Sequence, residues 1–347
     1  MVILSCPNAL VGHPDKLIFG FPLKDCGNDT LLKINFTEYY VMRKKKIFIL
    51  SAVIFLGLGI LLGPKLFQVT QEARNRQVLL EKRKAAWDNL KNELEGRIAD
   101  FRGDIGIVIK DLNKGWEIDF NKETSFPSAS LVKVPILLSY FYAQQEGRVR
   151  MNDLVSLKPY ERVPGSKVLG DSASGSVFSV EELFEPMIAR SDNTAANILI
   201  DLLGFEALNG YFNRIGLRNT NVTRRMMDFE ERKEGVENYT TAGDMAYLLE
   251  ILYRRSFLGR DISEKCLGFL RQQKINDRIP RKLPEGIAVA HKTGLENHIC
   301  HDAGIVFTQK GDFLICVLTR HRDRFAASAK RFISDIALLT YDYYQSF

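Results

Sequence analysis

The chain has 347 residues, of which 46% are apolar, 26% charged and 10% aromatic. These proportions are typical of a folded globular protein and exclude a disordered, collagen-like or low-complexity chain. The net charge of +6 is unevenly placed: residues 42–100 hold 12 basic and 6 acidic side chains, whereas residues 101–347 hold 33 and 32. Because the larger part is almost neutral, we expect no nucleic acid as a partner.

An apolar segment at residues 47–63, IFILSAVIFLGLGILLG, follows four consecutive cations. Its 17 residues would extend about 25 Å as a helix, the short end of what crosses a bilayer core of roughly 30 Å. A buried core helix is the alternative. Cations before an uncharged run are typical of an export signal, however, and the basic side of such a signal stays in the cytoplasm. No cleavage site is evident, so we predict a signal anchor at residues 42–63 and a single-pass protein of the cell membrane.

Residues 1–41 show no helical or strand period and contain Cys6 and Cys26. Met42, followed by the basic block, would be an ordinary start for a signal sequence. We therefore hypothesise that translation begins at Met42, and we leave residues 1–41 unassigned. Beyond the anchor, apolar side chains at helical spacing predict a stalk over residues 64–100 that leads into the first helix of a domain at residues 101–347.

Strand and helix patterns divide the domain into three parts. Strand-like runs stand near both of its ends, and a long helical region lies between them. This order predicts an antiparallel sheet assembled from distant parts of the chain. The expected strands are 106–112, 116–120, 287–291, 299–308 and 313–321, and the expected helices are 131–145, 180–189, 195–203, 205–215, 242–254 and 324–344.

Three cysteines follow the anchor, namely Cys266, Cys300 and Cys316. They contain no CxxC pair and predict no disulfide framework, although one bond between two of them stays open. Cys300 has potential metal ligands beside it, His298, His301 and Asp302. Along a strand, neighbouring side chains point to opposite faces, so these groups cannot converge on one ion. We therefore expect no metal site.

Ser130 and Lys133 are the first motif that can support chemistry, because residues three apart lie on one face of a helix. A serine hydroxyl is a poor nucleophile until a base takes its proton, and a desolvated lysine can do so. The N–H groups at a helix start also favour developing negative charge. Alone, the pattern is equally compatible with a surface position.

Two further motifs have simple structural alternatives. Residues 191–193, Ser-Asp-Asn, would be ordinary helix caps. Residues 292–294, Lys-Thr-Gly, stand at the end of an expected strand and would suit a carboxylate, because they offer a charge, a hydrogen bond and room for close backbone approach. The alternative is an ordinary strand end with a glycine turn.

Each motif occurs once and in this order: Ser191 follows Ser130 by 61 residues, and Lys292 follows Ser191 by 101. Together they resemble the class A β-lactamase family, the β-lactamase-like or penicillin-binding-protein-like serine hydrolases, over about residues 101–347. The resemblance implies an α/β (α+β) β-lactamase/transpeptidase-like fold. It would have a five-stranded antiparallel sheet with N- and C-terminal helices, and an all-helical lobe over about residues 125–280.

The resemblance also implies the chemistry of the site. Ser130 would attack the carbonyl of a β-lactam or of a D-Ala-D-Ala peptide, and Lys133 would help to take its proton. Ser191 would relay a proton to the leaving nitrogen. Asn193 would orient Lys133 and hold the side-chain amide of the substrate. No cofactor is implied.

Substrate binding would involve the third motif. Lys292 and Thr293 would attract the carboxylate of the substrate, and Gly294 would leave room beside them. The backbone N–H groups of Ser130 and Leu295 would form the oxyanion hole, in which each donor is typically worth about 3–4 kcal/mol.

The chain departs from the family in one segment. Class A β-lactamases place a glutamate, in an E-x-x-L-N motif, before a Thr-Thr pair to activate the water that hydrolyses the acyl-enzyme. Here residues 223–232 read TRRMMDFEER, without that motif. The glutamate position falls on Arg225 or its neighbours. Asp228 and Glu230 are the nearest acids, either as a substitute base or as solvated loop charges.

Three functions therefore stay open. The first is an exported hydrolase that β-lactams acylate at Ser130 and that hydrolyses them slowly. The second is a membrane-anchored D,D-peptidase that acts on peptidoglycan stem peptides. The third is a β-lactam receptor domain without turnover. We rank it last, because only a short cytoplasmic tail precedes the anchor.

Overall fold

A computed structural model describes residues 36–347, so most of the segment considered above as untranslated lies outside the described residues. The chain forms two compact units that meet after Lys82. Helix α1 (Phe36–Ala99) contributes residues to both of them.

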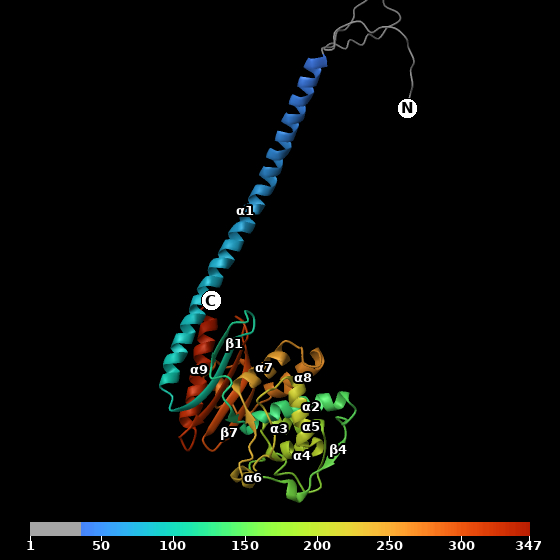
Figure 1. The fold of residues 1–347 in the computed structure, drawn as a ribbon, viewed down its shortest axis with the longest axis vertical. Helices are drawn as coiled ribbons and strands as arrows, with labels where there is room; N and C mark the ends of the chain where they lie inside the picture. Colours follow the sequence, from blue (N-terminus) through green and yellow to red (C-terminus); the bar gives the residue numbers. More distant parts are fainter. Residues whose placement is uncertain (1–35) are drawn as a thin grey trace, which may run out of the picture. The chain divides into compact units, whose positions relative to one another are not determined.

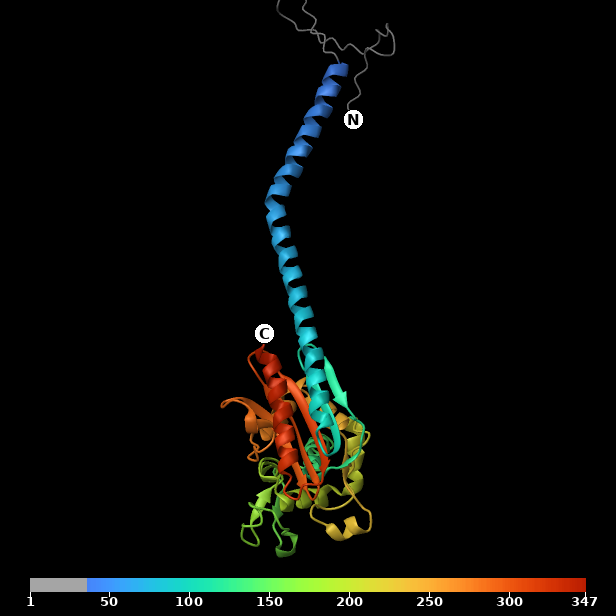
Figure 2. The same ribbon diagram turned by 90° about the vertical axis from the view of Figure 1, so that its left-hand side faces the viewer.

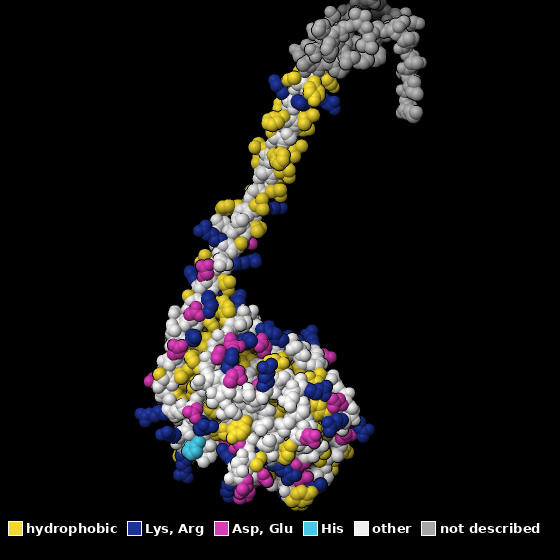
Figure 3. All heavy atoms as spheres, in the orientation of Figure 1, with side chains coloured by type: hydrophobic (Ala, Val, Ile, Leu, Met, Phe, Trp, Pro, Cys, Tyr) yellow, Lys and Arg dark blue, Asp and Glu magenta, His cyan; other side chains and the backbone are white. Residues whose placement is uncertain are grey.

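In the first unit, α1 is the one helix of the described residues that is long and apolar enough to cross a membrane. An 18-residue window of this helix has a mean hydropathy of 2.5, and none of the window is buried. Figure 3 shows hydrophobic side chains along the segment, with lysine and arginine side chains at its ends. These features are compatible with a membrane anchor.

The second unit, Arg83–Phe347, is built on the expected five-stranded antiparallel sheet. The strand order is β2-β1-β9-β8-β7, so β1, from the start of the unit, pairs with β9, the last strand of the chain. β7 is an edge strand, with a partner on one side only. The strands are β1 (Gly103–Asp111), β2 (Glu117–Phe120), β7 (Ala288–Glu296), β8 (Ile299–Phe307) and β9 (Phe313–His321).

The two faces of the sheet bury different sets of side chains, because successive residues of a strand point to opposite faces. In β1, Ile107 packs on one face and Val108 on the other. The end of α1 and helix α9 (Ala327–Gln345) cover the face of Ile107, side by side in Figure 2. Trp87 and Leu94 of α1 are buried there, so this unit includes part of the segment expected to lead into the domain.

The other face carries a helical lobe, as the sequence predicts. Short elements connect its helices: four 3₁₀ turns and two small two-stranded sheets, β3 with β6 and β4 with β5. The helices are α2 (Lys133–Gln145), α3 (Phe184–Ala189), α4 (Asn193–Leu203), α5 (Phe205–Ile215), α6 (Phe229–Lys233), α7 (Ala242–Tyr253) and α8 (Arg260–Arg271). The short elements are β3 (Phe126–Pro127), β4 (Leu154–Ser156), β5 (Val177–Ser179), β6 (Tyr239–Thr240), η1 (Ala129–Val132), η2 (Pro159–Glu161), η3 (Glu181–Leu183) and η4 (Ile279–Lys282).

Some local predictions were incomplete or wrong. Helices α6 and α8 were not predicted, and Ser130 lies in the 3₁₀ turn η1 rather than at the start of an α-helix. The Lys-Thr-Gly motif does not end a strand, because β7 continues to Glu296. Gly294 serves close packing instead of a turn: a Cβ atom there would lie 3.3 Å from the Cβ atoms of Ala129 and His301.

Candidate active site

Ser130 lies in η1, between strand β3 and helix α2, and is partly exposed. The residue before it, Ala129, has a φ of 45°, a conformation that residues other than glycine rarely adopt. Such backbone conformations cost about 1–3 kcal/mol and persist only where the surroundings hold them. The contact between Ala129 and Gly294 of β7 is one of these restraints.

Lys133 is the first residue of α2 and is fully buried. Its Nζ donates hydrogen bonds to the Ser191 carbonyl oxygen (2.7 Å), to Asn193 Oδ1 (2.6 Å) and to Ser191 Oγ (3.3 Å). Burial lowers the pKa of Lys133 to about 7, although Asp192 and Glu296 oppose the shift. A neutral amine, which can accept a proton, is therefore accessible near neutral pH.

The Ser-Asp-Asn motif both caps a helix and contacts Lys133, and different residues of the motif make these two kinds of contact. Asp192 is the N-cap of α4 and accepts a hydrogen bond from the Ala195 N–H at 3.0 Å. Ser191 precedes this cap residue and has a φ of 57°. Asn193 follows the cap residue. These two flanking residues contact Lys133, so the cap fixes the turn that presents them.

Lys292 reaches the same hydroxyl from the opposite lobe. Its Nζ donates to Ser191 Oγ (3.0 Å) and to the Thr293 carbonyl oxygen (3.0 Å). A hydroxyl oxygen has two acceptor sites, and in Ser191 both face lysines. The Ser191 O–H is therefore left to donate to a third group, as a proton relay requires.

The surroundings of Lys292 destabilise the positive charge of its side chain. Burial, together with the neighbouring cations Lys133 and Arg278, lowers the pKa of Lys292 well below its usual range. Two buried lysines thus contact one hydroxyl, and an incoming carboxylate would restore the charged form of Lys292 by supplying the opposite charge. The arrangement favours an anionic substrate.

The two expected oxyanion donors come from segments in contact. Ser130 follows Ala129, Leu295 follows Gly294, and a Cβ atom at Gly294 would lie 3.3 Å from that of Ala129. Leu295 is 49% exposed and lies in the edge strand. Both residues therefore lie next to the contact between η1 and β7, and their role as oxyanion donors stays a prediction.

The structure does not bring Asp228 and Glu230 to Lys133. The Asp228 side chain caps α6 and accepts a hydrogen bond from the Glu231 N–H at 3.2 Å. The Glu230 side chain is 83% exposed and pairs with Lys233 at 2.7 Å. A role for either carboxylate as the deacylation base stays a prediction.

A different residue of that loop is held beside the site. The Met226 N–H donates to Asn197 Oδ1 (2.7 Å), and Asn197 Nδ2 donates to the Met226 carbonyl oxygen (3.0 Å). Asn197 is one helical turn after Asn193 on α4, so both lie on one face of that helix. Met226 is adjacent to the position that the family motif assigns to a glutamate, and its side chain is buried.

Sequence reasoning missed Arg278, which carries no recognisable pattern. Its side chain is 1% exposed, and its Nε donates to the Cys300 sulfur at 3.2 Å.

The potential metal ligands near Cys300 each have a different hydrogen-bond partner. Asp302 forms a hydrogen bond with His291 Nδ1 (2.9 Å), and His301 Nε2 lies 2.9 Å from the Pro127 carbonyl oxygen. Ser130 three residues before a buried lysine, with Ser191 between that lysine and Lys292, is the arrangement of a serine hydrolase.

A family model described as the β-lactamase enzyme family matches residues 89–344. The chain belongs to this family, in its class A. β-Lactamase VEB-1 from Pseudomonas aeruginosa is 24% identical over 278 residues, which are 75% of this chain and 92% of that one. A β-lactamase structure from Sphaerobacter thermophilus DSM 20745 has a TM-score of 0.68 at 27% identity and covers 75% of this chain and 98% of that chain. PBP-A also has a TM-score of 0.68, at 26% identity, and covers 75% and 97%.

Proposed function

We propose that this protein is an exported, membrane-anchored serine hydrolase that β-lactams acylate at Ser130 and that hydrolyses the adduct slowly. The hydrogen-bonded chain from Lys133 through Ser191 to Lys292 is the observation that supports it. A variant of PBP-A has been solved as an acyl-enzyme complex with penicillin G. The apolar window of α1 supports an anchor, with the catalytic domain on the periplasmic or outer face of the membrane.

The proposed acylation uses these groups together with Ser130. Neutral Lys133 takes the Ser130 proton while Ser130 Oγ forms a bond to the lactam carbonyl carbon. The oxyanion is held by the Ser130 and Leu295 N–H groups. As the lactam C–N bond breaks, Ser191 gives its proton to the nitrogen and receives one from protonated Lys133. Lys292, with Thr293 beside it, holds the substrate carboxylate.

Deacylation lacks an obvious base. A positioned base typically accelerates such a step by 10²–10⁴-fold, and Met226 offers none. Asp228 and Glu230 have other partners in the structure. We therefore expect the adduct with a penicillin to persist for minutes or longer.

A membrane-anchored D,D-peptidase is the second candidate, favoured by the same missing base and by the likeness to PBP-A. A receptor domain without turnover is the third. A time course with a fluorescent penicillin distinguishes the first from the others, because the hydrolase loses its label slowly and can be labelled again, whereas the adduct of a peptidase or a receptor persists. Release of D-alanine from a pentapeptide then separates the peptidase from the receptor.

The pH dependence of acylation tests the role of Lys133. Burial lowers the pKa of Lys133 to about 7, so the protonated amine dominates below that pH and cannot act as a base. The acylation rate should therefore rise with pH and level off above about 7 in single-turnover measurements. A rate that is flat over about two units on either side of pH 7 would contradict this role.

Lys292→Ala should weaken acylation selectively. A charge-assisted hydrogen bond is worth roughly 1.5–3 kcal/mol, so we expect a loss of about ten- to a hundredfold with a β-lactam that carries a carboxylate. The uncharged ester of the same compound should lose far less. Lys265→Ala is the control, because Lys265 pairs with Glu181 away from the site. Equal losses for both compounds would show that Lys292 has a different role.

A further inference from the structure

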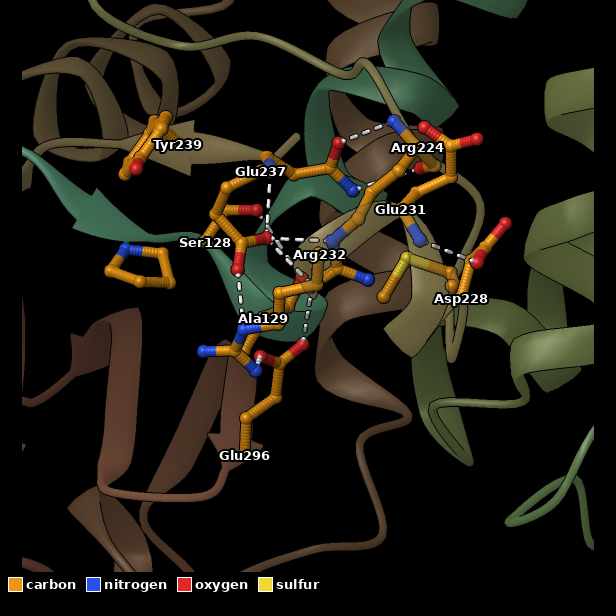
Figure 4. A network of polar contacts seen from close by, with 12 residues as sticks. Ser128, Ala129, Arg224, Asp228, Glu231, Arg232, Glu237, Tyr239 and Glu296 are labelled. Atoms are coloured by element: carbon orange, nitrogen blue, oxygen red, sulfur yellow. Dashed lines mark hydrogen bonds and ion pairs between the residues drawn. The ribbon is translucent and has the colours of Figure 1, made fainter. Parts of the chain in front are cut away.

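Two arginines and two glutamates form a closed ring of ion pairs next to Ala129 (Figure 4). Glu237 contacts Arg224 (2.6 Å) and Arg232 (2.9 Å). Glu296 contacts the same two arginines, at 3.5 Å and 2.9 Å. The side chains are 1% (Arg224), 29% (Arg232), 7% (Glu237) and 11% (Glu296) exposed, so we name this group the ion-pair ring and expect little screening by solvent.

The ion-pair ring joins two parts of the proposed site. Glu296 is the last residue of edge strand β7 and directly follows Leu295. The other three members lie between α5 and β6, in the segment that also carries Met226: Arg232 is in α6, and Arg224 and Glu237 lie on either side of that helix. Because β7 has a partner strand on one side only, its end on the open side depends on side chains such as Glu296 to keep it in place.

The loop side of the ring is firmly held. The Arg224 N–H donates to Asn238 Oδ1 at 3.0 Å, and Asn238 Nδ2 donates back to the Arg224 carbonyl oxygen at 3.0 Å. The Asn238 carbonyl oxygen in turn accepts a hydrogen bond from the Ser128 N–H at 2.7 Å. The loop is thereby fixed to the segment that leads into Ser130, and the ring extends this connection to β7.

We propose that Glu296 is a positioning residue: its ion pairs to Arg224 and Arg232 hold the end of β7, and with it the Leu295 N–H, in the geometry of the oxyanion hole. This inference rests on the proposed acyl-enzyme function. Glu296 acts through the backbone and does not touch the substrate. Its charge is required, because an amide cannot form both ion pairs.

The test compares Glu296→Gln with the wild-type protein and with Glu250→Gln. Glu250 is a half-buried carboxylate held by Lys110 (2.6 Å) and Arg254 (3.1 Å), away from the site, so it is a matched control. The probe is a penicillin labelled with ¹³C in the lactam carbonyl, and the readout is the infrared stretch of the ester carbonyl in the acyl-enzyme. Intact mass confirms the adduct, and stopped-flow labelling gives the acylation rate.

We expect the carbonyl stretch of Glu296→Gln to move to higher frequency, because a weaker N–H contact polarises the carbonyl less. Its acylation rate should fall about tenfold or more, since loss of one whole oxyanion donor typically costs 10²–10³-fold. Glu250→Gln should match the wild-type protein in both measurements. If Glu296→Gln does not fold, Arg232→Gln replaces it, because Arg232 is the most exposed member of the ring and the same changes are expected.

An adduct with the wild-type stretch and an acylation rate within about twofold of wild type, in a folded variant, would overturn the role of Glu296 alone. Failure of the wild-type protein to form any adduct would overturn the proposed function, and this inference with it. A merely structural role would lower thermal stability without moving the carbonyl stretch, and that outcome also contradicts the proposal.

Discussion

Ser130→Ala is expected to abolish covalent labelling by penicillins, with no adduct detected by intact-mass analysis after long incubation. Without the hydroxyl, no bond to the lactam carbonyl carbon can form, whatever the state of Lys133. Thermal unfolding should change little, because Ser130 is partly exposed and substitutions outside the core usually change stability by less than about 0.5 kcal/mol.

The control for this variant is Ser125→Ala. Ser125 is exposed and precedes the same 3₁₀ turn, so its loss should leave labelling at the wild-type level. An adduct that still forms in Ser130→Ala would show that another group is acylated. The proposal that Ser130 is the nucleophile would then be wrong.

Met226→Glu has the second largest expected effect, an acceleration of deacylation by about 10²–10⁴-fold. The two hydrogen bonds between Met226 and Asn197 hold this backbone one helical turn from Asn193, which contacts Lys133. A carboxylate placed there can remove a proton from a water near the Ser130 ester. Label lifetimes after acylation with a fluorescent penicillin measure the effect.

Three variants make this result specific. Met226→Gln has the same size as the glutamate variant without its basicity, so it should leave the adduct lifetime unchanged. Asp228→Asn and Glu230→Gln should leave acylation intact and test whether a shifted acid already serves as the base. Rapid turnover by the wild-type protein that is lost in Asp228→Asn would overturn our expectation of slow deacylation.

Much of the fold could be predicted from residues close together in the chain. The alternation of Ile105, Ile107 and Ile109 with their neighbours identifies β1, because one face of the strand is apolar over its whole length. Helix α8 was missed although its apolar residues have helical spacing, since the charged residues between them masked the pattern. The sequence also does not predict the extension of β7 to Glu296, because a glycine such as Gly294 is as compatible with a turn as with close packing inside a strand.

The residues of the candidate site could likewise be predicted only in part. Ser130, Ser191 and Lys292 could be predicted as site residues because each belongs to a short motif. Arg278 and Glu296 could not, because their importance comes from partners far away in the sequence. Arg278 bonds Cys300, and Glu296 bonds Arg224 from another lobe of the unit. No local pattern records such pairs, and an isolated arginine or glutamate is usually a solvated surface residue.

The strand order of the sheet has a consequence for biogenesis. Ile107 in β1 lies opposite Val317 in β9, so the first strand of the unit has its main partner only when the last strand is present. Pairings between such distant segments form slowly, because a long loop must close first. Lys292 also belongs to the late part of the chain. If the domain is exported as proposed, we expect a nascent polypeptide to remain unreactive toward penicillins until its C-terminal strands have crossed the membrane, which would confine acylating activity to fully exported molecules.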